Sequence, residues 1–346
     1  MHKIKVGLVG YGSQGTRIAD AISVQNDMEL AGVCLKELDI SAFMAFRKGF
    51  DLYLVDSDYA RAFKKAGIDV KGSISSLFSK VDVIVDVTPS GVGKKNKKKF
   101  YSKHDVKSVF QAGEPFEVAD IQTFMSTINY YEARKASSVR VPSPFAVSLT
   151  RILKPLDVKF GIKHVTCTLI RPGTEPMRGH HGPVDTIIPG EPYVEHGVLR
   201  VEMEQLLQKD VMFTSFAVPS ILLAVEAVVV DLERTASTED FMGLLCSIPR
   251  SILVRSDMGL QSTDAIFEYM RRVVRPSADI YEVCTWHEHV EASNGRLKLV
   301  QAFDPHCVQT PEVIDAIRAL ASEEKMEESF NRTNKALKIL NPEMYP

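Results

Sequence analysis

The chain has 346 residues, of which 45% are hydrophobic and 25% are charged, a composition typical of folded globular proteins. Its formal net charge of -2 gives no general attraction for nucleic acid or for an anionic membrane surface, so we expect neither as a partner. The length exceeds that of one ordinary core and therefore predicts two domains.

The N-terminal apolar stretch is short and runs into a glycine-rich turn, which predicts a first β-strand rather than a signal peptide. No apolar run approaches the roughly 20 residues needed to span a bilayer. Five scattered cysteines form no CxxC pair, so neither a zinc site nor a disulfide framework is indicated. We therefore expect a soluble, cytoplasmic protein without a bound metal.

Short apolar runs alternate with helical patterns at the start of the chain. Strands are predicted over residues 3–9, 28–35, 81–87 and 106–111, and the first is followed by a helix over 15–24. Near-continuous Val and Ile runs suit strands that are buried on both faces of a parallel sheet. Because helices separate these strands, the pattern predicts the βαβ units of a Rossmann domain.

From about residue 141 the apolar runs become longer and are separated by loops bounded by proline. These runs occupy residues 165–170, 211–218, 224–232 and 296–303. They predict an α+β domain with a largely antiparallel or mixed sheet. Helices are expected over 311–321 and 323–340.

The segment Gly10-Tyr11-Gly12-Ser13-Gln14-Gly15 follows the first predicted strand and opens the first predicted helix, the context that supports dinucleotide binding. Gly10 permits the tight turn, Gly12 lets the backbone approach a pyrophosphate, and Gly15 lets the helix pack closely on the strand. The helix N-terminus offers free N–H groups and a partial positive charge to phosphates. The alternative is a glycine-rich turn that binds nothing.

Two further segments are expected to line the same cofactor cleft. Lys36 stands at the end of the second predicted strand, where an NAD-preferring site usually has Asp or Glu. A cation there favours the 2′-phosphate of NADP over NAD, unless the side chain points into water. Thr88, Pro89 and Gly91 follow the third predicted strand, at the edge where open α/β sheets bind ligands, and a plain turn is the alternative.

Several motifs together resemble the archaeal, type II class of glyceraldehyde-3-phosphate dehydrogenase (GAPDH), over about residues 5–320. They lie at residues 10–21, 86–96, 110–114, 153–156, 182–189 and 259–263. The resemblance implies NADP or NAD as cofactor, with Gln111 and Gly113 in a matched cofactor segment, and a homotetramer. It also implies a Rossmann domain at residues 1–140, completed by a C-terminal helical segment at 305–346, and a GAPDH-like catalytic domain at 141–304.

The chain departs from the family's pattern where a nucleophilic cysteine is expected. By register, Pro144 takes the position of the family's Cys and Phe145 that of its Asn. Ala224 takes the position of the catalytic His, although a shift of two residues would put Glu226 there. Forming an acyl phosphate from an aldehyde requires a thiolate, so phosphorylating GAPDH activity is only a lesser alternative. A serine such as Ser143 would need an adjacent base, and no histidine lies nearby in the sequence.

A cofactor site without a covalent nucleophile suits direct hydride transfer, which needs a general acid and an anion-binding pocket. Arg171 matches the first arginine of the family's phosphate-binding motif, and Pro172 replaces the second. His181, beside His180, falls where many members carry Lys, and His196 matches the second His of a His-His-Gly stretch. A surface pair is the alternative for His180 and His181.

Glu226 is the one ionisable group near the lost histidine position. It would serve as an acid if it is buried with a raised pKa, and the alternative is an exposed carboxylate. The candidate catalytic residues are therefore His181, His196 and Glu226, and the candidate substrate-binding residues are Arg171, His180 and Ser143. His287 and His289 are expected to alternate along one strand and to serve packing or a subunit interface.

The sequence favours an oxidoreductase that moves hydride between NADP(H), or NAD(H), and a small anionic carbonyl, alcohol or imine. One alternative is a non-catalytic dinucleotide-binding paralogue that works as a sensor or an assembly subunit. Another is a different enzyme class that uses the cofactor only transiently. Fold alone does not decide among them.

Overall fold

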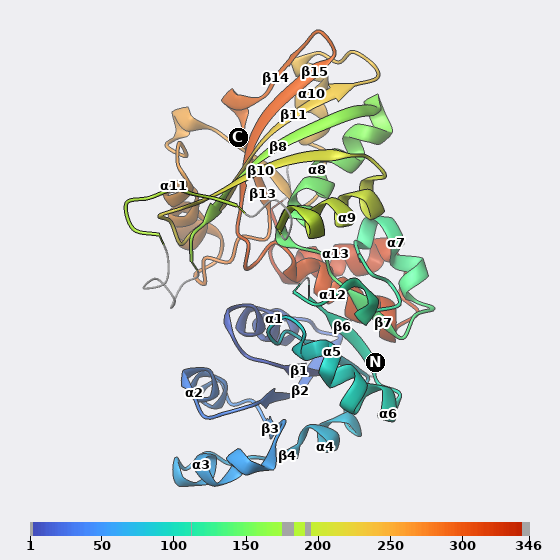
Figure 1. Cartoon of the computed structure of the whole chain (residues 1–346), viewed down its shortest axis with the longest axis vertical. Coiled ribbons are helices and arrows are strands. Elements are labelled where there is room, and N and C mark those ends of the chain that lie inside the picture. The colour runs from blue at the N-terminus through green and yellow to red at the C-terminus, as the bar shows by residue number, and fades with distance from the viewer. Residues whose placement is uncertain (1–2, 112, 175–182, 191–194, 341–346) are drawn as a thin grey trace. The chain divides into compact units, whose positions relative to one another are not determined.

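The structure is a computed structural model that describes residues 3–111, 113–174, 183–190 and 195–340 (Figure 1), with the backbone alone for residues 195 and 196. The chain divides into two compact units. Unit 1 comprises Met1–Pro142 and Thr310–Leu337, and unit 2 comprises Ser143–Gln309 and Lys338–Pro346. Each unit is described by itself below.

Unit 1 is built on a seven-stranded parallel sheet in the order β4-β3-β2-β1-β5-β6-β7. The strands are β1 (Ile4–Val9), β2 (Met28–Leu35), β3 (Leu52–Leu54), β4 (Gly72–Ser73), β5 (Val83–Asp86), β6 (Lys107–Phe110) and β7 (Ser138–Arg140). The chain runs outward from β1 to β4 and then returns to β5 on the other side of β1. The direction therefore switches between β1 and β5, and such sheets bind ligands outside the carboxyl ends of the strands at this point.

Helices of unit 1 connect these strands and cover the sheet. They are α1 (Ser13–Ser23), α2 (Ile40–Arg47), α3 (Ala60–Lys65), α4 (Ile74–Phe78), α5 (Val92–Asn96), α6 (Ser102–His104), α7 (Ser126–Ala133), α12 (Thr310–Ala321) and α13 (Met326–Ala336). The stripe Ile18, Ala19 and Ile22 buries one face of α1. All residues of α12 from Thr310 to Leu320 are buried, because α12 packs against α1, α7, α13 and β6. Figure 1 draws α12 and α13 in red beside these blue-to-green elements, which lie far from them in the sequence.

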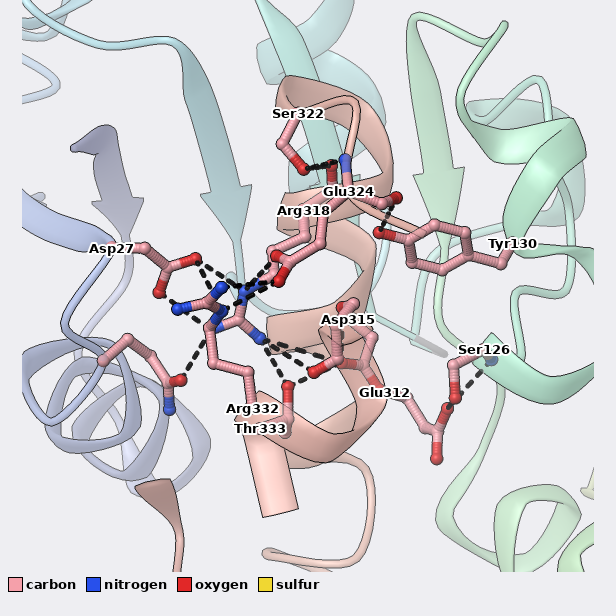
Figure 2. Close-up of polar contacts among 12 residues, drawn as sticks. Asp27, Ser126, Tyr130, Glu312, Asp315, Arg318, Ser322, Glu324, Arg332 and Thr333 are labelled. Carbon is pink, nitrogen blue, oxygen red and sulfur yellow. Dashed lines mark hydrogen bonds and ion pairs between the residues drawn. The ribbon is translucent and has the colours of Figure 1, made fainter. Parts of the chain in front are cut away.

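A buried arginine ties α12 and α13 to the start of the chain (Figure 2). The guanidinium of Arg318, fully buried, donates to both carboxylate oxygens of Asp27 at 2.7 and 2.9 Å and to Oε1 of Gln25 at 2.6 Å. It also donates to the hydroxyl of Thr333 at 2.5 Å, and that hydroxyl donates to Asp315 at 2.5 Å. This cluster, the Arg318 network, joins the α1–β2 turn to two helices some 290 residues further along the chain.

Unit 2 is built on an eight-stranded mixed sheet in the order β12-β13-β15-β11-β8-β10-β9, with β14 beside β15. The strands are β8 (Ile162–Pro172), β9 (Ile188–Pro189), β10 (Val211–Val218), β11 (Ala224–Leu232), β12 (Ser251–Val254), β13 (Val283–Trp286), β14 (Glu291–Ser293) and β15 (Arg296–Phe303). The helices are α8 (Pro144–Phe160), α9 (Glu195–Leu207), α10 (Thr238–Leu245) and α11 (Thr263–Tyr269). In β11 every second residue from Ala224 to Leu232 is buried, so one face of the sheet is in the core.

The predicted fold class, a parallel Rossmann sheet followed by a second, mixed sheet, is confirmed. The expectation for His287 and His289 is wrong: β13 ends at Trp286, and residues His287–His289 form one turn of 3-10 helix. The last helix, α13, is also shorter than the predicted 323–340.

Two further findings concern the described residues alone. No helix among them is long and apolar enough to cross a membrane. No group of three or more His, Cys, Asp or Glu side chains in the same part of the chain is arranged to hold a metal ion.

Candidate active site

The turn between β1 and α1 has the backbone geometry that its glycines predict. Gly10 has a φ of +94°, in the left-handed region, and its N–H donates to the carbonyl of Cys34 at 3.0 Å. A Cβ on Gly15 would lie 2.5 Å from the carbonyl oxygen of Gly10, so only glycine permits this close packing of helix on turn. A Cβ on Gly12 would meet no described atom within 4 Å. Gly12 therefore faces open space, which leaves its backbone free to approach a ligand.

The N-terminus of α1 has no side-chain cap and no acidic residue in its first turn. Two side chains of that turn instead donate to the carbonyl of Ser13, Thr16 at 3.0 Å and Arg17 at 2.6 Å. Arg17 adds a positive charge to the positive end of an 11-residue helix. The open backbone at Gly12 and this helix end together suit the phosphates of a dinucleotide.

The second loop, residues 87–91 after β5, is held by a buried carboxylate that sequence reasoning missed as a site residue. Oδ1 of Asp86 accepts from the N–H of Thr88 at 3.0 Å and from its hydroxyl at 2.5 Å. Oδ2 accepts from Asn96 at 2.9 Å and from the hydroxyl of Tyr101 at 2.5 Å. Asp86 therefore fixes Thr88 at the carboxyl end of β5, beside the glycine-rich turn after β1.

The remaining predicted cofactor residues follow the same edge of the sheet. Gly91 has a φ of +76° and precedes α5, and Pro89 is exposed in the same loop. A Cβ on Gly113 would lie 3.7 Å from Cα of Ser90, so the segment after β6 runs beside this loop. Gln111 is buried, and its Oε1 has no hydrogen-bond partner among the described residues. An unpartnered buried acceptor is a feature that a bound ligand would relieve.

Of the predicted cofactor residues, Lys36 has an exposed side chain and Tyr11 a buried one. Lys36 is exposed directly after β2, where a cation is able to meet a phosphate. The ring of Tyr11 is buried edge-to-face against Phe50, with 6.0 Å between centroids. Burial and the charge of Asp20 raise the pKa of Tyr11 to about 12. Tyr11 therefore contributes backbone and packing to the turn.

In unit 2, helix α8 begins at Pro144, and its N-terminus is capped by Ser143. Oγ of Ser143 accepts from the N–H of Ala146 at 3.2 Å. The N–H and hydroxyl of Ser143 donate to the carboxylate of Glu202, on α9, at 3.0 and 2.5 Å. Sequence reasoning missed Glu202, which lies 59 residues away and is fully buried. Ser143 thus has a carboxylate partner, although no histidine is near it in the sequence.

Apolar side chains also pack near the start of α8. The ring of Phe145 packs edge-to-face on Phe303, the last residue of β15, with 5.3 Å between centroids. Ala224, the first residue of β11, pairs with Phe303 in the sheet and is also buried. Ala224 therefore lies in apolar surroundings, whereas Pro144 directly follows the polar contact between Ser143 and Glu202.

One turn further along α8 and two residues further along β11 lies a buried polar cluster. The hydroxyl of Ser148 donates to Oε2 of Glu226 at 2.8 Å. Nε2 of Gln301, on β15, donates to the same oxygen at 2.7 Å and to Oγ of Ser148 at 3.0 Å. We call these three residues the Glu226 cluster.

The environment of Glu226 favours its neutral form. Its side chain is fully buried and its described hydrogen-bond partners are uncharged. Burial raises the pKa of Glu226 to about 8, although the hydrogen bonds from Gln301 and Ser148 lower it. The alternative of an exposed carboxylate is therefore wrong, and a carboxyl group with this pKa is able to donate a proton near neutral pH.

The structure brings only some of the other predicted substrate residues into view. Arg171 lies on β8, half-buried, paired with Ala217 of β10. It lies on the same sheet face as Leu169, the cross-strand partner of Glu226. His180 and His181 lie outside the described residues, and of His196 only the backbone, in α9, is described.

The cysteines are free thiols, and Cys34, Cys167, Cys284 and Cys307 are buried. Burial and the nearby Glu226 raise the pKa of Cys167 well above its usual value, which keeps this thiol protonated. Cys307 directs its Sγ at the carboxylates of Asp304 and Asp279, at 3.1 and 3.4 Å. Its raised pKa makes Cys167 unsuited to act as a nucleophile.

Comparison with known proteins relates the chain to one group over nearly its whole length. It is 36% identical over 338 residues to the glyceraldehyde-3-phosphate dehydrogenase of Methanothermus fervidus, with 97% of this chain and 99% of that protein covered. The protein of the same name from Thermococcus kodakarensis is 36% identical, with 98% and 99% covered. That from Halobacterium salinarum is 35% identical over 339 residues, with 97% and 100% covered.

A solved structure shares the fold at low identity. Aspartate semialdehyde dehydrogenase II from Vibrio cholerae matches with a TM-score of 0.63 and 13% sequence identity, over 91% of this chain and 97% of that one. No protein-family model matches the chain.

Proposed function

The chain belongs to the archaeal glyceraldehyde-3-phosphate dehydrogenase family, and from this premise we propose that it is an NAD(P)-dependent oxidoreductase without a covalent cysteine intermediate. Its substrate is a small anionic carbonyl, alcohol or imine. Unit 1 would be the cofactor domain and unit 2 the substrate domain, with residues 305–309 and 338–346, expected in the cofactor domain, grouped with unit 2 instead.

The observation that carries cofactor binding is the open backbone at Gly12 beside the uncapped, cation-flanked N-terminus of α1. Gly10 to Gly15 would hold the pyrophosphate, and Asp86 would position Thr88 beside it. When bound, the nicotinamide supplies or accepts the hydride. Lys36, exposed after β2, supports NADP over NAD as the preferred cofactor.

The absence of a thiol step rests on Pro144, which has no nucleophilic side chain and stands at the family's cysteine position. Direct reduction of a carbonyl adds a hydride to carbon and a proton to oxygen, so the protein needs an acid rather than a thiolate. Glu226 is our first candidate for that acid because of its raised pKa, with His181 and His196 as the other candidates. Arg171 is the first candidate to bind the anionic group of the substrate, and His180 and Ser143 are further candidates.

Cofactor binding is tested by isothermal titration calorimetry, in which the purified protein is titrated with NADPH and, separately, with NADH. The variant Gly12→Ala places a methyl group where no described atom lies within 4 Å, so we expect it to fold normally. We also expect it to bind the dinucleotide at least tenfold more weakly, because the methyl group would meet the pyrophosphate. Equal affinity of the two proteins, or no binding of either dinucleotide, would contradict the proposal.

The thiol question has its own experiment. A variant with all five cysteines replaced by serine or alanine is expected to keep its turnover in a screen of anionic carbonyls and imines with NADPH. A folded variant that has lost its turnover would show that a thiol takes part. Four of the five cysteines are buried, so folding must be checked first by near-UV circular dichroism.

A second candidate function is a non-catalytic dinucleotide-binding paralogue, a sensor or assembly subunit. Pro144 and Ala224, at the positions where the family's catalytic pair is expected, have no ionisable side chains, and this favours it. It predicts dinucleotide binding with no turnover in that screen.

A further inference from the structure

The Glu226 cluster contains two buried oxygens that its hydrogen bonds leave unsatisfied. Glu226 Oε2 accepts two hydrogen bonds, whereas Oε1 has no partner among the described residues. Both N–H groups of Gln301 are used, yet its Oε1 also has no partner there. Two acceptors left in this way would each incur the desolvation cost of a buried polar group.

The two unsatisfied oxygens belong to side chains that face each other across the sheet. Glu226 and Gln301 are direct cross-strand partners on β11 and β15, and their side chains already meet through Nε2 and Oε2 at 2.7 Å. An ionised carboxylate has no proton to offer, but a protonated carboxyl group donates one. A proton on one unsatisfied oxygen would satisfy both oxygens at once.

We propose that Glu226 carries a proton on Oε1 at neutral pH and donates it to Oε1 of Gln301, forming a two-bond acid–amide pair. Gln301 and Ser148 are then positioning residues: Gln301 closes the pair, and Ser148 fixes the carboxyl plane through Oε2. The role of this neutral acid as the proton donor to substrate rests on the proposed function, whereas the pair itself does not.

The groups around the pair agree with a neutral carboxyl. Thr285 of β13 pairs with Gln301 in the sheet, and its buried, uncharged hydroxyl has no partner among the described residues. Cys167, on β8, is a protonated thiol. From α8, the guanidinium of Arg151 donates to the carbonyls of Tyr281 and Val308, both at 2.7 Å. On the same sheet face, Arg171 lies two residues beyond Leu169, the cross-strand partner of Glu226.

Infrared difference spectroscopy of the whole protein tests the pair, with Glu226→Gln as the blank. We expect the C=O stretch of one protonated carboxyl group at pH 7, lost with a midpoint near pH 8. A band that instead titrates at about pH 4.3, as for an ordinary Glu, would overturn the proposal. If Glu226→Gln does not fold, ¹³C NMR of the wild-type protein labelled at the glutamate carboxyl carbons reports the same midpoint.

Variants of the neighbours test the partner. Gln301→Met removes one donor to the C=O group and the acceptor of the O–H group, so the band should move to higher frequency. Thr285→Val is the matched control, since it removes the hydroxyl of the cross-strand neighbour of Gln301 and leaves Glu226 and Gln301 unchanged. The band should stay in place. An unmoved band in Gln301→Met, or an equal shift in Thr285→Val, would show that Gln301 is not the partner.

Turnover separates this inference from the proposed function. Suppose that the infrared spectrum shows a protonated Glu226 while Glu226→Gln has an unchanged pH profile of kcat/KM. The acid–amide pair would then be supported, and Glu226 would be excluded as the acid that protonates the substrate. A protein that binds no dinucleotide would remove the proposed function, while the infrared midpoint would still decide the pair.

Discussion

The two units each bury a polar cluster, and the clusters are built on opposite principles. The Arg318 network of unit 1 is ionic and bidentate, with a guanidinium opposite a carboxylate (Figure 2). The Glu226 cluster of unit 2 contains no cation and leaves oxygens without described partners. A matched network suits a permanent structural joint. An incompletely matched one suits a group whose protonation state changes.

The contrast extends to pH, because the two carboxyl groups shift in opposite directions. Although burial alone would raise the pKa of Asp27, hydrogen bonds and charge from Arg318 lower it below its usual value. The stability that Asp27 contributes is thus present above its unfolded pKa and lost as pH falls through the lowered one. For Glu226 the raised pKa means a contribution that is complete below about 4.5 and declines as pH rises to about 8.

The largest expected effect comes from breaking the ionic cluster. Arg318→Met leaves Asp27 and Asp315 without their buried cation, and we expect it to cost about 3–5 kcal/mol of unfolding free energy. Urea denaturation followed by circular dichroism measures this cost. A loss below 1 kcal/mol would mean that the network does not hold α12 to the sheet.

The second prediction concerns pH. Between pH 5 and pH 8 the wild type should lose roughly 3–4 kcal/mol more stability than Glu226→Gln, because only the wild type has a carboxyl group to ionise there. Denaturant midpoints at several pH values provide the comparison. If the two proteins lose stability equally between pH 5 and pH 8, Glu226 does not ionise in that range, which contradicts the prediction.

A smaller effect is expected at the helix side of the same cluster. Ser148→Ala removes one hydrogen-bond donor and should cost about 1 kcal/mol at pH 6. Since the lost donor favoured the carboxylate, the pKa of Glu226 should rise, and the alkaline decline in stability should extend to higher pH. Stability measured from pH 6 to pH 10 checks both effects, and a decline that ends at lower pH would be inconsistent with this role.

The smallest effect is expected at the rim of the ionic cluster. The side chain of Arg332 is 33% exposed and pairs with Glu324 at 2.7 Å. Arg332→Ala should cost less than about 1 kcal/mol, since solvent and salt screen such a pair. The same denaturation assay serves, and a cost equal to that of Arg318→Met would remove the distinction between core and rim.

Local patterns predicted much of the fold. Strands β2, β10, β11 and β15 have the bounds that their apolar runs predict, and the glycine turn after β1 is short enough to be encoded by neighbouring residues. Strands β3, β4, β7, β9 and β14 were missed because each spans only two or three residues, too few to show alternation.

The site was harder to predict because its contacts depend on register between distant segments. Glu226 was found from its position in the sequence, but its partners lie 78 residues before it, at Ser148, and 75 after it, at Gln301. The same holds for Glu202, whose bond to Ser143 depends on how α9 packs beside α8. No pattern in neighbouring residues records such a pairing.

The return of the chain through α12 and α13 has a consequence for its synthesis. On the ribosome, Asp27 and Gln25 emerge long before Arg318. The sheet of unit 1 therefore lacks the guanidinium of Arg318 during most of translation. Unit 2 also closes late, because the N–H of Leu340 donates to the buried Glu282 at 2.8 Å. An mRNA truncated before codon 310 would therefore yield a fragment with two incomplete cores rather than one finished domain. We expect such fragments to depend on chaperones.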